Sequence, residues 1–278
     1  MRSRWSEGLE RPATIRPDHL RQVLTNIGIE RWEARLSGPA FARHRHDRLA
    51  IGLTLGGVQS FFYRGEYRYC LPGHVHILYP DEVHDGAAGT EDPFSYRIAY
   101  IDPALLQSAL GGVRLPVVAA TVELRHLPHD LARSLWLSDE FEAETDTVTL
   151  LADLLLRLAG GRSRPLRLAS TEMQRIRDRI AADPAASLRS NELEQLAGLD
   201  RWTIARQFRA LFGTSPRRFR TLRQLDLVKA MLLDGMPAAS AALEAGFADQ
   251  AHMSRHFKAA VGLTPGTWLA RLRASPLR

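Results

Sequence analysis

The sequence predicts a two-domain α+β protein, in which an N-terminal antiparallel β-barrel with following helices precedes an all-α C-terminal domain. Three observations predict this fold class: strand-length apolar segments between turns at 41–101, helical periodicity at 130–159, and a helical repeat in the last third of the chain. The chain of 278 residues is 45% hydrophobic, which is enough to give each of two domains its own core.

The barrel is predicted from short apolar segments that end in glycine- or proline-containing turns. The clearest of these segments are 49–55, 58–63, 67–71 and 75–79. Short strands with such turns at regular spacing are typical of a small antiparallel barrel or sandwich. The single cysteine, Cys70, falls in one of these strands and is expected to be a small buried side chain.

Helical spacing replaces the strand pattern after Asp102-Pro103. Within 130–159 the apolar residues produce a wide leucine face: Leu150, Leu151, Leu154, Leu155 and Leu158. A face of this width packs either on its own domain or on a second subunit. We therefore predict a homodimer through the 130–159 helices, with packing inside the monomer as the alternative.

Glycines and a proline at 160–165 indicate a linker. We predict a first domain at 1–160, a linker at 161–166 and a second domain at 167–278. The net charge of +6 is unevenly spread, because positions 166–278 hold 18 basic and 10 acidic residues and the rest of the chain holds 19 and 21. Polyanion binding is therefore expected of the second domain, although solvated helix faces are often rich in arginine as well.

The C-terminal domain contains an internal repeat at an offset of 49 residues. The first copy matches the second by residue type at Ile204, Arg206, Phe208, Gly213, Ser215, Pro216 and Phe219, which correspond to Met253, Arg255, Phe257, Gly262, Thr264, Pro265 and Trp268. Two copies are too few for a solenoid, so the repeat favours a pair of helix-turn-helix units over a plain helical bundle.

Local signals in the first copy fit a helix-turn-helix unit. Asn191 and Glu194 are expected to form a capping box at the start of its first helix. Gly198 supplies the turn, and Asp200 caps the second helix.

The outward faces of the two second helices are the predicted base readers. These residues are Trp202, Ala205, Arg206 and Arg209 in the first copy, and Gln250, Ala251, His252, Arg255 and Lys258 in the second. Arginine can donate two hydrogen bonds to guanine, glutamine pairs with adenine, and tryptophan or alanine contacts a thymine methyl group. We therefore predict double-stranded promoter or operator DNA as the partner, and no catalytic residue.

The second copy resembles the AraC/XylS family of transcription regulators at 246–250 (GFADQ), 253–258 (MSRHFK) and 262–265 (GLTP). The resemblance implies that one long helix, 217–233, joins the units and sets the recognition helices roughly one DNA turn apart. The family's base-contact positions fall on the predicted readers, apart from Arg209 and Lys258. Ala238 and Ala241 stand where the family usually has branched aliphatic residues, which predicts looser packing in the second unit.

The N-terminal domain is similar to the family's cupin-type ligand-binding domain at His44-Arg45-His46, Pro72-Gly73, Tyr79-Pro80, His84 and 100–103. The resemblance implies a cupin-like barrel that binds a small-molecule effector. The candidate pocket residues are His44, His46, Tyr63, His84, Tyr96 and Arg97, for which core or surface roles are the alternative.

Three of these histidines raise the question of a metal. His44, His46 and His84 could surround zinc and leave one position open. Enzymatic cupins carry a glutamate shortly after the second histidine, and positions 47–50 hold none. We predict no metal, no cofactor and no enzyme; the alternatives are a metal-dependent cupin enzyme fused to a DNA-binding module and a ligand-independent DNA-binding regulator.

The remaining expectations concern location and partners. No apolar run approaches the roughly 18 residues of a membrane span, and the N-terminus has no apolar signal core. We expect a cytoplasmic, nucleoid-associated protein with no membrane partner. RNA polymerase is a further expected partner of such a regulator.

Overall fold

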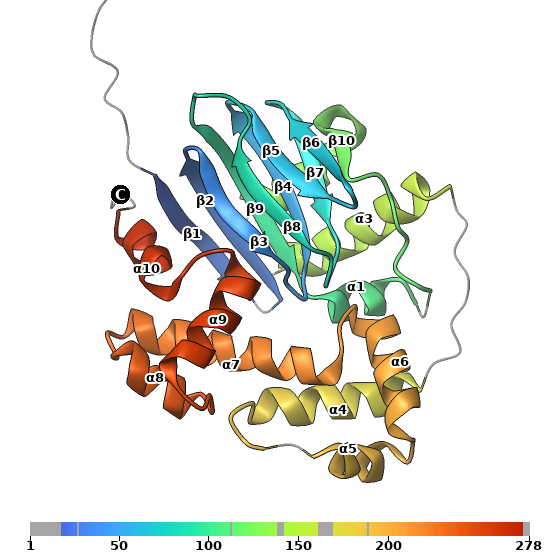
Figure 1. The fold of residues 1–278 in the computed structure, drawn as a ribbon. Helices are drawn as coiled ribbons and strands as arrows, with labels where there is room; N and C mark the ends of the chain where they lie inside the picture. The colour runs from blue at the N-terminus through green and yellow to red at the C-terminus, as the bar shows by residue number, and fades with distance from the viewer. Residues whose placement is uncertain are drawn as a thin grey trace, which may run out of the picture.

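The computed structural model describes residues 18–26, 28–111, 113–137, 142–160, 169–187 and 189–274. They form a β-sandwich above a group of helices, and the last of these helices runs beside the first strand (Figure 1). The order of elements, strands first and helices after them, confirms the predicted α+β class.

Within the described residues, the strands form a six-stranded and a four-stranded sheet, and all strand pairs are antiparallel. The larger sheet has the order β1 (His19–Asn26), β2 (Ile29–Leu36), β9 (Phe94–Ile101), β4 (Leu49–Gly56), β7 (His74–Leu78) and β10 (Thr121–Glu123). The smaller sheet has the order β3 (Pro39–His44), β8 (His84–Ala88), β5 (Gln59–Tyr63) and β6 (Glu66–Cys70). Strands β4 to β7 lie at the four predicted segments.

The sandwich begins earlier than predicted, because β1 and β2 precede position 41. Arg31 obscures the apolar alternation of β2. Its side chain is 3% exposed and donates hydrogen bonds to the carbonyls of Ser134 and Leu135, at 3.1 and 3.0 Å. A buried arginine that binds the last turn of a helix counts as a polar residue when the sequence is searched for apolar alternation. The sequence therefore did not predict strand β2.

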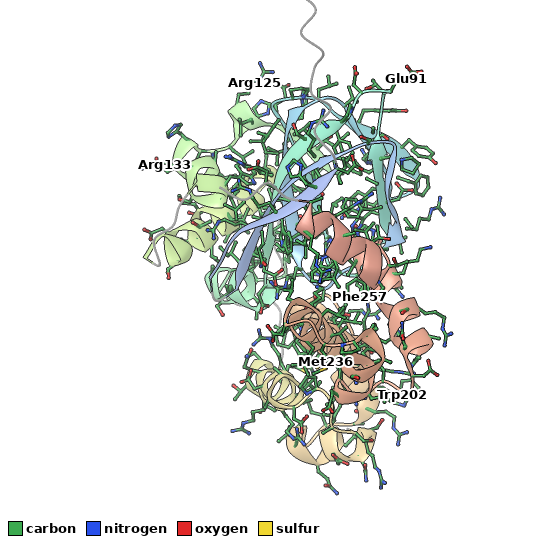
Figure 2. All side chains as sticks on the ribbon, turned by 90° about the vertical axis from the view of Figure 1, so that its left-hand side faces the viewer. Glu91, Arg125, Arg133, Trp202, Met236 and Phe257 are labelled. Atoms are coloured by element: carbon green, nitrogen blue, oxygen red, sulfur yellow. The ribbon has the colours of Figure 1, made fainter. Side chains whose placement is uncertain are left out.

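Helices α1 (Pro103–Ala109), α2 (His129–Leu137) and α3 (Glu142–Leu158) lie on one side of the strands (Figure 2), with the short 3-10 helix η1 (Leu124–His126) preceding α2. Their apolar side chains share one cluster with the outer face of the six-stranded sheet.

This cluster contains most of the predicted leucine face. Leu151, Leu154 and Leu155 are at most 3% exposed within the monomer, whereas Leu158 is 38% exposed. Packing inside the monomer, the alternative stated for this face, therefore accounts for most of it. The predicted homodimer stays a prediction.

The helical part contains α4 (Ser170–Ala182), α5 (Ser190–Ala197), α6 (Arg201–Phe212), α7 (Pro216–Leu233), α8 (Ala238–Glu244), α9 (Gln250–Val261) and α10 (Pro265–Arg273). Helices α5 and α6 are the first helix-turn-helix unit, and α8 and α9 are the second. Helix α7 is the long connecting helix that was predicted at 217–233.

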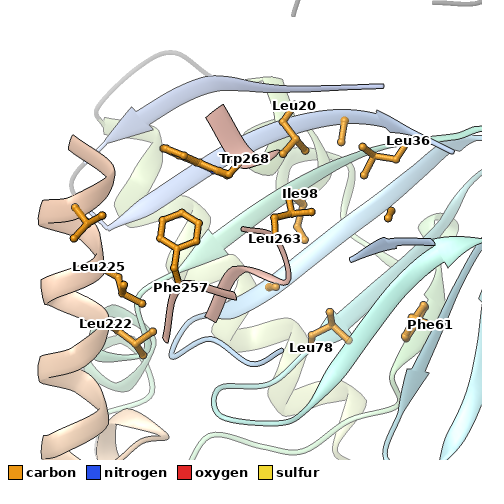
Figure 3. Packing of buried hydrophobic residues seen from close by; sticks show 14 of the residues in the cluster. Leu20, Leu36, Phe61, Leu78, Ile98, Leu222, Leu225, Phe257, Leu263 and Trp268 are labelled. Carbon is orange, nitrogen blue, oxygen red and sulfur yellow. The ribbon is translucent and has the colours of Figure 1, made fainter. Parts of the chain in front are cut away.

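The two units pack differently. Ile176, Phe208 and Phe219 lie in a cluster of their own, which joins α4, α6 and α7. In contrast, Phe257 and Trp268 of the second unit share one apolar cluster with the interior of the sandwich (Figure 3). The sandwich core thus continues into the second unit.

The helix ends follow the predicted signals with one exception. Asp200 accepts hydrogen bonds from the backbone nitrogens of Trp202 and Thr203, both at 3.0 Å, and Gly198 has a left-handed φ of 64°. The predicted capping box is wrong, because α5 begins one residue before Asn191. Glu194 instead accepts a hydrogen bond from the backbone nitrogen of Arg201 at 2.9 Å and so ties α5 to α6.

The second unit is not loosely packed. Ala241, Ala242 and Ala245 are 0% exposed, and Ala241 and Ala242 are the buried residues of α8. Small side chains let a helix approach its neighbours closely, so the expectation of looser packing at Ala238 and Ala241 is wrong for Ala241.

Candidate functional site

Helix α6 presents its predicted base readers to solvent. Trp202 is 76% exposed, and Ala205, Arg206 and Arg209 are exposed as well. Trp202 lies at the periphery of the helical part (Figure 2). The helix begins at its Asp200 cap and buries its opposite side, so the periodicity of the sequence fixes which residues face outward.

Helix α9 repeats this arrangement. Gln250, Ala251, Arg255 and Lys258 are exposed, while Met253 and Phe257 on the other side are 0% exposed.

His252 differs from the other predicted readers. It is half-buried, its Nε2 lies 3.0 Å from Nε2 of His256, and its ring packs against Phe247 at 5.7 Å between centroids. His252 therefore contacts the body of the second unit from the first turn of the recognition helix.

The C-terminal ends of both recognition helices rest on the sandwich. Gly213 ends α6 and Gly262 ends α9, at matching positions of the repeat and with φ of 72° and 78°. A methyl group on Gly213 would collide with Pro80, and one on Gly262 would lie 2.9 Å from Nδ1 of His44. Only glycine gives both the left-handed conformation and this close approach.

Hydrogen bonds and ion pairs extend this contact. The backbone nitrogens of Ala42 and Arg45 donate to the carbonyls of Gly262 and Ala259, each at 3.1 Å. The guanidinium of Arg271 donates to the carbonyl of Ala40 at 2.9 Å.

Asp81, in the loop after β7, pairs with arginines of α6 and α7. Its carboxylate lies 2.7 Å from Arg218 of α7 and 3.7 Å from Arg209, one of the predicted base readers. Arg45 of the sandwich lies 3.6 Å from the same carboxylate. The contact of the first recognition helix with the sandwich thus includes ion pairs, whereas the second is held by backbone hydrogen bonds and apolar packing.

A cavity of about 140 Å³ lies between the sandwich and helices α7, α9 and α10. The sandwich lines it with residues that include Trp32, His44, His46, His76, His84, Tyr96, Ile98 and Tyr100. The helical part lines it with Leu222, Arg223, Leu225, Asp226, Lys229, Ala260, Val261 and Trp268. A molecule in this cavity would touch both parts of the chain at once.

Three histidines in the cavity are held in one tautomer. Nδ1 of His44, His46 and His84 lies 2.9, 2.8 and 3.0 Å from the carbonyls of Ala42, Arg48 and Glu82. A carbonyl can only accept, so each Nδ1 carries the proton and each Nε2 is a bare acceptor while the ring is neutral. Burial, together with the neighbouring His84, lowers the pKa of His44 to about 3.

The same causes act on the other rings. Burial lowers the pKa of His46 and His84 as well, and lowers that of His76 to about 3. Burial also raises the pKa of Tyr96 and Tyr100, so both phenols stay protonated. The aromatic lining of the cavity is therefore uncharged at neutral pH.

The principal charged groups around the cavity neutralise one another. The pairs are Arg48 with Glu30 at 2.8 Å, Arg223 with Asp47 at 3.1 Å and with Asp226 at 3.2 Å, and Lys229 with Asp226 at 3.4 Å. Burial alone would lower the pKa of Arg223, but Asp47 and Asp226 raise it above its usual value.

Four of the six predicted pocket residues, His44, His46, His84 and Tyr96, line this cavity. Tyr63 does not line it, because its hydroxyl donates to Glu82 and accepts from the backbone nitrogen of Tyr79. Arg97 does not line it either. Alternation along β9 turns Tyr96 to the cavity and Arg97 to the other face, where it binds Glu33 at 3.1 Å.

The sequence analysis missed His76. Its ring lies between Phe61 and Tyr96, with centroids 5.6 and 6.2 Å away, and covers Gly52 so closely that any Cβ there would collide with it. A glycine inside a strand was the available signal. The helical lining was missed too, because α7 and α10 reach the cavity only through the docking of the two parts.

The described residues also bear on metals and membranes. Among them, no group of three or more His, Cys, Asp or Glu side chains is arranged to hold a metal ion. No helix in the described ranges has the length and apolar character needed to cross a bilayer.

Comparison with known proteins matches both parts of the chain. Residues 26–159 match the model of the AraC-like ligand binding domain, and residues 193–271 match a helix-turn-helix domain. The HTH-type transcriptional regulator YbfI of Bacillus subtilis is 24% identical over 242 residues, which cover 84% of this chain and 88% of YbfI. An AraC-like transcription regulator of Streptomyces antibioticus is 32% identical over 87 residues, 31% of this chain and 29% of that protein.

Solved structures share the whole fold. ToxT from Vibrio cholerae with an unsaturated fatty acid bound has a TM-score of 0.64 at 12% identity, over 91% of this chain and 99% of ToxT. ToxT bound to a methylnaphthalenyl butenoic acid has a TM-score of 0.62 at 12% identity, over 88% and 99%. With a ligand-binding domain followed by a helix-turn-helix domain, the chain belongs to the AraC family of transcription regulators.

Proposed function

We propose that α6 and α9 read two adjacent major-groove segments of one operator, and that an effector bound in the 140 Å³ cavity controls this reading. The observation that carries the proposal is the shared wall of the cavity. Strand residues line one side, and Ala260 and Val261, at the end of recognition helix α9, line the other.

The DNA side is supported by exposure and charge. Arg206 and Arg255 occupy the same position of the repeat on the exposed faces of α6 and α9. We assign them the bidentate contacts to guanine, and assign Trp202 and Ala251 contacts to thymine methyl groups. Exposed side chains near the start of a recognition helix reach deepest into the major groove.

The effector side is supported by the packing of the second unit. Because α9 ends against the cavity wall, an occupant that fits one docking geometry better than another shifts the balance between them. ToxT, which has this fold, has been solved with small amphipathic acids bound. We infer that a small organic molecule is also the effector here.

The base readers are tested by alanine substitution in the full-length protein. Genomic fragments selected by the protein supply the operator, and Arg206→Ala and Arg255→Ala should each weaken operator binding by about 1 to 3 kcal/mol. Each should also relax the sequence preference at a single position, which binding to operators with one altered base pair measures.

Arg125→Ala is the matched control. Arg125 lies on the sandwich, at the opposite end of the molecule from Trp202 (Figure 2), and its loss removes the same charge. It should leave operator affinity unchanged. If Arg206→Ala and Arg255→Ala weaken operator and random DNA equally, the assignment of these arginines to bases is wrong.

Other parts of the function rest on the sequence alone. Homodimer formation and contact with RNA polymerase stay predictions. The proposal contains no catalytic step, and it places the chain on chromosomal DNA in the cytoplasm.

A further inference from the structure

Three of the four histidines that line the cavity present hydrogen-bond acceptors to it. Because Nδ1 of His44, His46 and His84 is bound to a carbonyl, Nε2 of each ring can only accept. Among the described residues, Nε2 of His46 is buried and has no hydrogen-bond partner. A buried acceptor without a donor is unfavourable, so the natural complement of this surface is a group that brings protons.

The three rings are close enough to serve one small group. The centroid of the His84 ring lies 4.3 Å from that of His44 and 4.8 Å from that of His46. The centroids of His44 and His46 are 6.2 Å apart. Within the described residues these side chains are not arranged to hold a metal ion, which favours an organic donor over a cation such as zinc.

The charges around the cavity argue against a charged occupant. Arg223 is bound by both Asp47 and Asp226, and Lys229 is bound by Asp226. An anion would have to displace one of these carboxylates, and a cation would have to displace a buried guanidinium or ammonium group. A neutral molecule leaves every pair intact.

The volume of the cavity and its apolar walls limit the rest of the effector molecule. The volume of about 140 Å³ is close to that of the roughly 150 Å³ engineered cavity that binds benzene. Trp32, Ile98, Leu225 and Trp268 are among the apolar residues that line it. A single ring fits such a space.

We propose that the effector is a small uncharged hydroxyl compound, the size of a phenol or a cyclic alcohol, whose O–H group donates its one proton to Nε2 of His46, beside His44 and His84. The inference rests on the proposed function, because it identifies the chemistry of that same effector site.

A matched set of probes tests the chemistry on the native full-length protein. Phenol and toluene differ only in the donor, as do cyclohexanol and methylcyclohexane, while benzoate and benzylammonium carry charge. Binding is followed by calorimetry and by the fluorescence of the lining residues Trp32 and Trp268. Phenol or cyclohexanol should bind at least tenfold more tightly than its counterpart without a hydroxyl, and the two ions should bind more weakly than either.

A variant locates the donor contact. His46→Phe keeps an aromatic ring and removes the unpartnered acceptor, so it should abolish the preference for phenol over toluene. His129→Phe, at a surface histidine, should keep that preference. Should His46→Phe fail to fold, the probe series on the native protein still decides the question.

Three outcomes overturn the inference. They are equal binding of phenol and toluene, tighter binding of benzoate than phenol, and stabilisation by Zn²⁺ that His46→Phe removes. Failure of the proposed function has a different signature. In that case phenol binds with the expected preference but leaves operator affinity unchanged.

Discussion

Asp81 is a single residue that pairs with two arginines of the helical part, one of them the predicted base reader Arg209. It has a left-handed φ of 61° and a side chain that is 10% exposed, and it pairs with Arg218 and Arg209 of the helical part. A DNA phosphate would be attracted to the same guanidinium groups. The carboxylate therefore lowers the positive charge that the first recognition helix offers to DNA.

Replacing Asp81 by asparagine should raise DNA affinity. Asparagine tolerates the left-handed conformation, so the change removes charge without straining the loop. We expect a several-fold gain at low salt, and a salt dependence steeper by about one phosphate contact, measured by fluorescence anisotropy over a salt series.

Asp92→Asn is the control, since Asp92 is exposed in the loop before β9. It changes the net charge equally and should have little effect. Weaker DNA binding by Asp81→Asn would mean that the loop acts only as a structural support.

The buried histidines predict a pH-dependent stability. The pKa values of His44 and His76 fall from 6.5 to about 3 in the folded chain, so the unfolded chain binds protons first as the pH decreases. The free energy of unfolding should be constant above pH 6.5 and should fall between 6.5 and 3. At pH 5 the loss should be about 2 kcal/mol for each of the two histidines.

Urea unfolding at pH values of about 7.5 and about 5 measures this loss. His76→Phe should reduce the difference between the two conditions, whereas His129→Phe, at an exposed position, should not. Equal stability at both pH values would show that the folded chain protonates these histidines as readily as the unfolded chain does.

Among the elements, the ends of α6 and α9 make the most specific contacts. Gly198, Gly213 and Gly262 all have a left-handed φ, but a methyl group on Gly198 would meet nothing within 4 Å. Gly198→Ala should therefore cost only the conformational strain, about 1 kcal/mol. In Gly213→Ala and Gly262→Ala, a collision of the new methyl group with the sandwich adds to this strain.

Both of these variants should lose more stability than Gly198→Ala in thermal unfolding. Each should also speed hydrogen exchange at its own contact: the segment around Pro80 for Gly213, and the backbone nitrogens of Ala42 and Arg45 for Gly262. Equal losses in the three variants would argue against tight docking of the helix ends.

Elements were predictable where their signals are local. The Asp200 cap, the Gly198 turn and the outward position of Arg206 follow from short-range periodicity. The capping box at Asn191 failed because α5 begins at Ser190, and Glu194 instead accepts from the backbone nitrogen of Arg201 on the next helix. The leucine face of α3 was visible, but periodicity cannot distinguish a neighbour in the same chain from one in another.

For the whole molecule, the sequence predicted the sandwich and the helical part better than the contact between them. His44, His46 and His84 were found because the resemblance to a cupin-type ligand-binding domain implies a pocket at an HxH pair and a later histidine. Leu225 and Trp268 were interpreted as ordinary helix residues, since their approach to the cavity depends on how the two parts dock. The predicted boundary at 161–166 implies separate cores, whereas the sandwich and the second unit share one apolar cluster.

The matched glycines at the ends of α6 and α9 have a consequence for the operator. Because both recognition helices end on the sandwich, the sandwich fixes the distance between their C-terminal ends. We therefore expect the spacing between half-sites that the protein accepts to depend partly on the sandwich as well as on the base readers. Substitutions in the segments around Pro80 and His44 could change which promoters are read while every base-reading side chain stays the same.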